Sequence, residues 1–401
     1  MLRVLYLVHD LSDPAVRRRV LMLQAGGAEV TLAGFRRGEN HLADIEGVTP
    51  LELGATADAR FAQRLVAVAG AAVRLPRMLA SAQRPDVILA RNLEMLALAS
   101  RASVHFGTVP IAYECLDVHR LMLRADPVGR FLRGAERHFS RKAGLVVTSS
   151  PAFVEHYFKP LSGIHAPVHL LENRVLELHG GDAAVPARTR PAGAPWRIGW
   201  FGAIRCRRSL DLLCAFTRRM EGRFEVVLRG RPAYGEFDDF DGIIAREPFL
   251  HFEGPYRNPE DLPAIYAGVD FTWAIDFFEE GQNSRWLLPN RLYEGCRHGA
   301  LPIVLDGTET ARLAARHGVG IALADGRLET LTDRFATFGE DAYRALHARL
   351  VTLGTRPWIL DRADCAAFVQ RLAALRQPAG QAASLSPLPS LVANKVDCHD
   401  R

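Results

Sequence analysis

The chain has 401 residues, of which 48% are hydrophobic and 24% charged, and its formal net charge is +5. This length predicts two domains, and six scattered cysteines without a C-x-x-C pair argue against a disulfide scaffold or a structural zinc site. The apolar stretches are too short and too charged to cross a bilayer, and the N-terminus lacks the long apolar run of a signal peptide, so we expect a cytoplasmic protein.

Apolar runs alternate with helical patterns through the first part of the chain. We expect strands at residues 2–8, 29–33, 87–90, 110–115, 144–149 and 169–172, and helices at 14–25 and 62–82, the second kinked at Pro76. Buried strands separated by helices indicate a parallel sheet with right-handed crossovers. Residues 1–175 are therefore predicted to form one Rossmann-like domain.

A Gly- and Pro-rich segment at residues 176–195 is typical of a linker between domains. After it the alternation restarts, with strands at 196–201, 224–228, 250–253, 271–275 and 301–305 and helices at 209–220, 262–268 and 290–298. We expect a second doubly wound α/β domain over 196–375, whose final helix can pack back on the first, and a disordered tail at 376–401. A ligand is expected at the carboxyl ends of the strands, in a cleft between the domains.

The most informative segment surrounds residue 290. Pro289 precedes a helix whose first N–H groups, at Asn290, Arg291 and Leu292, suit a diphosphate, because a helix N-terminus carries partial positive charge. Glu294 lies about one turn further along, where its carboxylate can accept hydrogen bonds from two ribose hydroxyls. The segment therefore predicts a nucleotide site.

The order Pro289-Asn290-Arg291-x-x-Glu294 resembles the donor-site motif of GT4-type retaining glycosyltransferases of the GT-B fold, in the subset with Pro-Asn-Lys/Arg-x-x-Glu. Other segments agree in order and spacing, so that the resemblance covers roughly residues 1–375. It implies two Rossmann-like domains facing a cleft. It also implies transfer of a sugar from a nucleoside diphosphate to a glycan or lipid-linked acceptor, with retention of anomeric configuration, in surface polysaccharide assembly.

The resemblance also assigns site residues beyond this motif. Gly202, Arg205 and Arg208 occupy the positions of the family's phosphate-binding loop. The resemblance also implies that Glu294 and either Asp117 or His119 act at the reacting centre, and the spacing leaves open whether Asp117 or His119 does so. The remaining assignments are Arg229, Gly254, Pro255 and Tyr256 near the nucleobase and Asp13 and Arg17 on the acceptor side. Position 286 departs from many members, because a Trp stands there in place of a Glu.

The chemistry explains why these residue types recur. A departing nucleoside diphosphate gains negative charge, which guanidinium groups and helix N–H groups stabilise. Neither a metal nor another cofactor is then expected. The acidic pair Asp239 and Asp241 superficially matches a metal-binding D-x-D, but a surface loop explains it better. The arginines after residue 204 could equally form a solvated cluster, and Asp117 or His119 a local helix cap.

Three alternatives remain open. The same fold could serve a nucleotide-sugar epimerase or hydrolase. A nucleic-acid-binding or scaffold protein could use the basic first half, where residues 1–175 hold 22 Lys and Arg against 16 Asp and Glu. A nucleic-acid-binding protein needs aromatic side chains among its arginines, on which bases can stack. The aromatic residues of this sequence do not cluster among the arginines, so no nucleic-acid partner is expected. Arginine-bearing helices at 60–83 and 120–142 could rest on an anionic membrane or could simply be amphipathic core helices.

Overall fold

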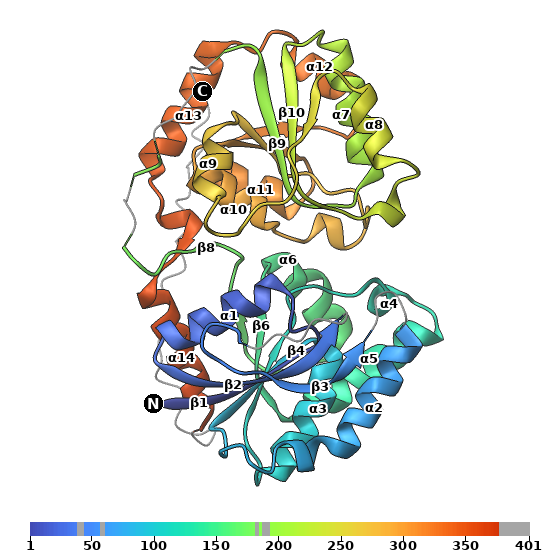
Figure 1. Ribbon diagram of the computed structural model, residues 1–401, viewed down its shortest axis with the longest axis vertical. Helices are drawn as coiled ribbons and strands as arrows, with labels where there is room; N and C mark the ends of the chain where they lie inside the picture. The colour runs from blue at the N-terminus through green and yellow to red at the C-terminus, as the bar shows by residue number, and fades with distance from the viewer. Residues whose placement is uncertain (38–43, 57–60, 181–183, 187–192, 377–401) are drawn as a thin grey trace, which may run out of the picture.

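The computed structural model describes residues 1–37, 44–56, 61–180, 184–186 and 193–376. Two separate parallel sheets, each flanked by helices, form the lower and upper parts of the molecule in Figure 1. The tail predicted to be disordered lies, except for Arg376, outside the described residues, as do residues 181–183 and 187–192 of the predicted linker. Within the described residues, no helix combines the length and apolar character needed to cross a membrane.

The N-terminal sheet has seven parallel strands in the order β3-β2-β1-β4-β5-β6-β7. They are β1 (Leu2–Val8), β2 (Ala28–Arg37), β3 (Leu51–Thr56), β4 (Val87–Arg91), β5 (Ile111–Glu114), β6 (Ala143–Thr148) and β7 (Val168–Leu170). Every strand pair in the sheet is parallel, as the alternation of apolar and helical segments predicts. The predicted strand at 29–33 is longer than expected, and β3 was not predicted.

Helices cover both faces of this sheet. Alternate residues of β1 point to opposite sides, so that Val4 and Tyr6 pack with α1 (Pro14–Ala25), whereas Leu5 and Leu7 join the core formed with α2 (Phe61–Met78) and α3 (Asn92–His105). The other helical segments are α4 (Arg120–Leu123), α5 (Pro127–Phe139), η1 (Ser140–Lys142), α6 (Pro151–Phe153) and η2 (Val154–Ser162). The long second helix contains Pro76, but it ends at Met78 rather than residue 82.

The C-terminal sheet has six parallel strands in the order β11-β10-β9-β12-β13-β14. They are β9 (Trp196–Ile204), β10 (Phe224–Pro232), β11 (Leu250–Phe252), β12 (Phe271–Trp273), β13 (Leu301–Leu305) and β14 (Ile321–Leu323). The helices are α7 (Arg207–Arg219), α8 (Phe240–Arg246), α9 (Leu262–Ala267), α10 (Asn290–Arg297), α11 (Glu309–His317), α12 (Leu328–Ala336) and α13 (Glu340–Leu353), with the short turns η3 (Tyr234–Glu236), η4 (Asn283–Arg285), η5 (Arg356–Trp358) and η6 (Ala374–Arg376). Buried Trp200 and Trp273 belong to its main hydrophobic core.

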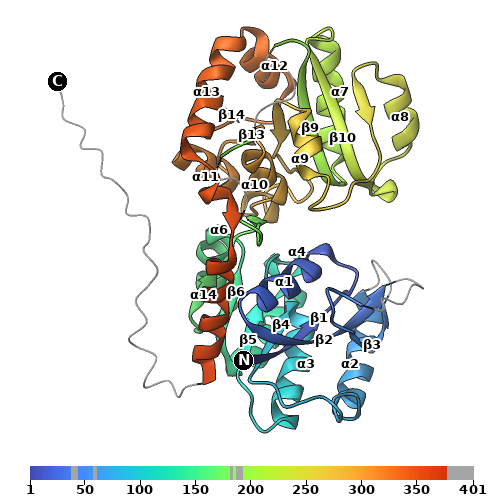
Figure 2. The same ribbon diagram turned by 60° about the vertical axis from the view of Figure 1, so that its left-hand side comes forward.

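The chain returns to the N-terminal sheet at its end. The short strands β8 (Val175–Leu176) and β15 (Ile359–Leu360) pair in parallel, and α14 (Arg362–Ala373) then packs beside α1, as Figure 2 shows. Phe368 and Leu372 of α14 are buried in the core that holds Leu23 of α1. The two helices approach closely at Gly26, where an added Cβ would lie 2.4 Å from the carbonyl oxygen of Cys365.

Candidate functional site

The strand order reverses once in each sheet, between β1 and β4 and between β9 and β12. Ligands of open α/β sheets bind outside the carboxyl ends of strands at such points. The segments that follow the strands meet across the domain interface, because Asn283 Nδ2 donates to Asp117 Oδ1 and Ser150 Oγ donates to the carbonyl oxygen of Trp286. The structure therefore brings the segments after the strands of the two domains together, with the predicted site residue Asp117 among them.

Helix α10 begins at Asn290, with Pro289 in extended conformation before it. The amides of Asn290 and Arg291 are its first two, whereas the N–H of Leu292 donates to the carbonyl oxygen of Pro289 at 3.0 Å. The Arg291 side chain folds back, and its Nη2 donates to the carbonyl oxygen of Ile275 at 2.9 Å. The helix start thus offers two amides to an anion, while Arg291 fixes the segment after β12.

Glu294 is buried one turn inside α10. Its Oε1 accepts from Asn258 Nδ2 at 2.9 Å and its Oε2 accepts from the Tyr266 hydroxyl at 3.2 Å. Burial raises the pKa of Glu294, while these hydrogen bonds and the positive charges of Arg18 and Arg291 act in the opposite direction. Each carboxylate oxygen keeps a second lone pair, with which it can accept a ribose hydroxyl.

Glycines lie near the carboxyl ends of β9 and β10. Gly202 pairs with Gly230, and a Cβ on Gly230 would lie 1.9 Å from the Gly202 carbonyl oxygen. The Gly230 N–H donates to the carbonyl oxygen of Gly254 at 2.9 Å. All three have positive φ, which glycine adopts without steric cost. The predicted phosphate loop and the predicted nucleobase region are therefore linked through backbone.

Arg205 and Arg208 both turn toward the loop after β12. The Arg205 guanidinium stacks on Phe278 at 4.6 Å and lies 3.8 Å from Asp276 Oδ2. Arg208 lies 4.3 Å above the ring of Phe277 and pairs with Glu280. The two arginines predicted to bind phosphate therefore lie beside the β9/β12 switch point. Each is paired with a carboxylate, which a diphosphate could replace.

Of the predicted nucleobase residues, Tyr256 lies near Glu294. Tyr256 is half-buried, and burial, followed by the charge of Glu294, raises the pKa of its hydroxyl. Its ring centroid is 6.4 Å from that of Phe201 at the end of β9. Pro255 is exposed, and the Arg229 guanidinium turns to Glu253, 3.4 Å away.

Asp117 and His119 take different positions. Asp117 reaches the other domain at Asn283, whereas His119 caps α4, its Nδ1 accepting from the Leu121 N–H at 3.3 Å. Burial and the negative charge of Asp117 raise the pKa of Glu279, so two carboxyl groups from opposite domains lie close together. Asp117 therefore lies at the interface between the two domains.

The acceptor-side predictions lie at the start of α1. Asp13 caps that helix, accepting from the Ala15 N–H at 2.9 Å, and is 3.4 Å from Arg91 Nη2. Arg17 pairs with Glu46 and reaches the other domain, where its Nη1 donates to the carbonyl oxygen of Asn258 at 3.3 Å. Arg17 therefore lies next to the residue that holds Glu294, nearer the predicted nucleotide side than we expected.

Two residues, His156 at the domain interface and Asn92 at the β1/β4 switch point, were missed from the sequence. His156 stacks on Trp286 with ring centroids 5.4 Å apart, so the residue in place of the family's first Glu serves as an interdomain contact. Asn92, at φ 70°, contacts His9 at the β1/β4 switch point over 3.2 Å. Asn283 itself could be singled out from its place in the segment before α10, but its contact with Asp117, 166 residues away, could not.

Comparisons with known proteins agree with this architecture. No model of a known protein family matches the chain. The succinoglycan biosynthesis protein ExoL of Rhizobium meliloti is 61% identical over 385 residues, covering 95% of this chain and 96% of that protein. Among solved structures, HepE of Anabaena in complex with UDP and glucose is 16% identical over 92% of this chain and 99% of its own, with a TM-score of 0.63. Sucrose-phosphate synthase of Thermosynechococcus elongatus is 13% identical over 93% and 98%, with a TM-score of 0.69.

These structural neighbours have the two-domain GT-B fold of glycosyltransferases, so the predicted fold is confirmed. Because the sequence identity to these structures is low, they show the fold alone. The similarity to ExoL, in contrast, extends over nearly the whole of both chains. The chain belongs to the family of the succinoglycan biosynthesis protein ExoL.

Proposed function

We propose that the protein is a cytoplasmic glycosyltransferase that moves a sugar from a nucleoside diphosphate to a glycan or lipid-linked acceptor in surface polysaccharide assembly. The observation that carries the proposal is Glu294, a buried carboxylate one turn inside α10 at the β9/β12 switch point. The name of ExoL supports a role in polysaccharide assembly, and HepE, of the same fold, binds UDP and glucose.

In this proposal the donor's diphosphate lies at the amides of Asn290 and Arg291. Arg205 and Arg208 exchange their carboxylate partners in the 276–280 loop for phosphate oxygens, where charge accumulates as the sugar departs. Glu294 accepts hydrogen bonds from the ribose hydroxyls, and Asp117 orients the acceptor. The two domains thus hold donor and acceptor in one geometry.

A transfer assay tests the reaction. Purified protein is incubated with radiolabelled UDP-, GDP- and ADP-sugars and with the lipid extract of cells that assemble the polysaccharide. We expect label to pass from one nucleotide sugar into the lipid fraction, and Glu294→Gln to reduce the rate at least about tenfold. Exposed Glu329→Gln is the matched control. Consumption of donor at an equal rate without acceptor would instead identify a hydrolase or an epimerase.

We also propose retention of anomeric configuration and independence from metals, both on the resemblance of the donor motif. NMR of the first product formed gives the anomeric configuration of the new bond, and an inverted bond would contradict retention. EDTA is expected to leave the initial rate unchanged, since guanidinium and amide groups bear the phosphate charge. A rate that falls with EDTA and returns with Mg²⁺ would contradict metal independence.

A further inference from the structure

One side of the N-terminal domain combines exposed cations with exposed apolar side chains. We define the α2–α3–α5 face as the outward surface of α2, α3, α5 and η1. Its exposed cations are Arg74, Arg77, Arg101, Arg130, Arg137, Arg141 and Lys142. Among the described side chains of these elements the carboxyl groups are Glu136, which is fully buried, and Glu94 in the first turn of α3. The face is therefore of nearly uniform sign.

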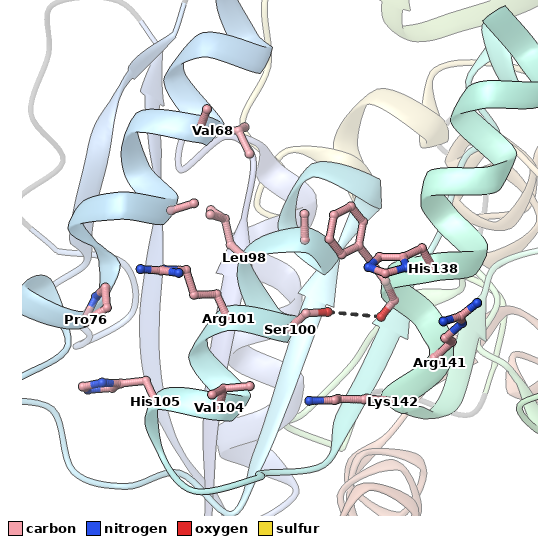
Figure 3. Close-up of a pocket in the computed structure, with 14 residues that line it drawn as sticks. Val68, Pro76, Leu98, Ser100, Arg101, Val104, His105, His138, Arg141 and Lys142 are labelled. Carbon is pink, nitrogen blue, oxygen red and sulfur yellow. Dashed lines mark hydrogen bonds between the residues drawn. The ribbon is translucent and has the colours of Figure 1, made fainter.

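The same helices also carry large exposed apolar side chains. Val73 is 74% exposed, Val104 62% and Phe131 72%, and they come from three different helices. A groove of about 880 Å³ lies between the helices, floored by Val68, Ala72 and Leu98. The basic side chains Arg101, His138, Arg141 and Lys142 line the same groove, and Figure 3 shows them together with Val68 and Leu98. Apolar and basic side chains thus share one groove.

Neither core packing nor helix dipoles account for the pattern. The inner stripes of α2 and α5, with Leu75 and Leu132, already pack on the N-terminal core. A helix C-terminus favours cations in its last turn, which explains Arg77, His105, Arg137 and His138. It does not explain Arg74, well inside α2, or the exposed Phe131. A surface on which cations and inserted apolar side chains alternate fits an anionic bilayer.

We propose that the α2–α3–α5 face rests on an anionic phospholipid membrane, with its cations on lipid phosphates and Val73, Val104 and Phe131 among the acyl chains. An acidic protein would satisfy the cations, but it gives no reason for exposed apolar side chains spread over three helices. The proposal goes beyond sugar transfer and does not depend on the donor site. It gives the enzyme a fixed side toward any membrane that carries an acceptor.

Flotation with vesicles tests the proposal. The full chain is mixed with vesicles of phosphatidylglycerol and phosphatidylcholine, or of phosphatidylcholine alone, and centrifuged through a density gradient. We expect flotation only with phosphatidylglycerol, and its reduction at high salt. The double substitution Arg141→Glu with Lys142→Glu is expected to weaken partitioning at least about tenfold, and Phe131→Ser to weaken it without changing the salt dependence.

The control reverses two exposed charges elsewhere, Arg219→Glu on α7 with Arg349→Glu on α13, at the same change of net charge. It is expected to float like the unaltered protein. Every variant should have the melting temperature of the unaltered protein and should be stabilised by UDP to the same extent. A loss of UDP binding would then be distinguished from a loss of membrane binding. Equal flotation with neutral vesicles, no flotation at all, or equal losses in the control and the face variants would overturn the proposal.

Discussion

Glu294 concentrates the chemistry of the candidate site in one residue. A buried carboxylate is costly unless its oxygens are bonded, and Asn258 and Tyr266 meet that need. Asn258 lies on an exposed segment, so a ribose can approach the carboxylate from that side without opening the core. The same burial raises the pKa of Glu294, so protonation begins at a higher pH than for a solvated glutamate.

Glu294→Gln is expected to weaken UDP binding about 10- to 100-fold, because charge-assisted hydrogen bonds to the ribose become neutral ones. Titration calorimetry at several pH values measures this. In the unaltered protein affinity should fall as the pH drops toward the raised pKa of Glu294, since the charged form is the better acceptor. The affinity of the variant for UDP should not show this fall at low pH. An unchanged affinity, with Glu329→Gln as reference, would remove the ribose assignment.

A second carboxyl group, Glu136, is buried, and its hydrogen-bond partners in the described part of the chain are two tyrosines rather than a cation. Its oxygens accept from the Tyr113 hydroxyl at 2.7 Å and the Tyr157 hydroxyl at 2.5 Å. Burial raises the pKa of Glu136 to about 7, although both hydrogen bonds oppose the shift. The folded protein thus prefers the protonated form more strongly than the unfolded chain does, so this group contributes most stability at low pH.

The free energy of unfolding should therefore lose about 3 kcal/mol through Glu136 as the pH rises past its ordinary pKa of 4.5 and its folded pKa of about 7, and the loss should level off about one unit above the folded pKa. Glu136→Gln keeps an acceptor oxygen and removes the titration. Urea denaturation at pH 5 and pH 8 should show a smaller difference for the variant than for the unaltered protein or Glu329→Gln. An identical difference in all three would show that the Glu136 carboxyl is not perturbed.

At the scale of elements, α10 is held directly against β12. A Cβ added at Gly295 would lie 2.4 Å from Cγ2 of Thr272, so the helix reaches this position only because residue 295 has no side chain. The Thr272 hydroxyl also donates to the carbonyl oxygen of Arg291 at 3.2 Å. The close packing sets where the helix N-terminus points, and therefore where a diphosphate would lie.

Gly295→Ala is accordingly expected to destabilise the protein by about 1–3 kcal/mol through overpacking. Gly134→Ala is the matched control, because Gly134 lies in α5 with no atom within 4 Å of an added Cβ. That substitution should stabilise the protein by up to about 1 kcal/mol through helix propensity. Chemical denaturation gives both values, and similar effects of the two substitutions would contradict the packing argument.

Local signals predicted most of these elements. Apolar runs located β1, β9 and β13, and the Pro289 signal located the start of α10, because each pattern is contiguous in the chain. Strand β3 was missed because Glu52 and Gly54 interrupt its apolar pattern. The pairing of β8 with β15 joins two-residue strands far apart in the chain, which no local pattern can indicate.

At the scale of the molecule, the last helix completes the first domain. The ring of Phe368 is buried against α1, with the Arg19 guanidinium 5.3 Å from its centroid and His169 stacked at 5.5 Å. The fold of residues near the N-terminus therefore depends on a segment some 340 residues later. The sequence analysis expected the final helix to pack back on the first domain. The individual contacts, like that between Asp117 and Asn283, depend on how the domains are placed, so the sequence did not show them.

Phe368→Ala is expected to cost about 3–5 kcal/mol of stability, as for other large buried side chains. Hydrogen exchange should rise in α1, although the substitution lies in α14. Val351→Ala, at an exposed apolar position of α13, should change the stability by less than about 0.5 kcal/mol. Unchanged exchange in α1 would show that α14 is not part of the N-terminal core.

The central claim is that the domain interface holds a nucleoside diphosphate at the start of α10. A crystal structure of the protein with UDP tests it most directly. The account predicts diphosphate oxygens within hydrogen-bond distance of the amides of Asn290 and Arg291 and of the Arg205 or Arg208 guanidinium, with ribose hydroxyls on Glu294. UDP bound away from α10, or a ribose that does not contact Glu294, would contradict it.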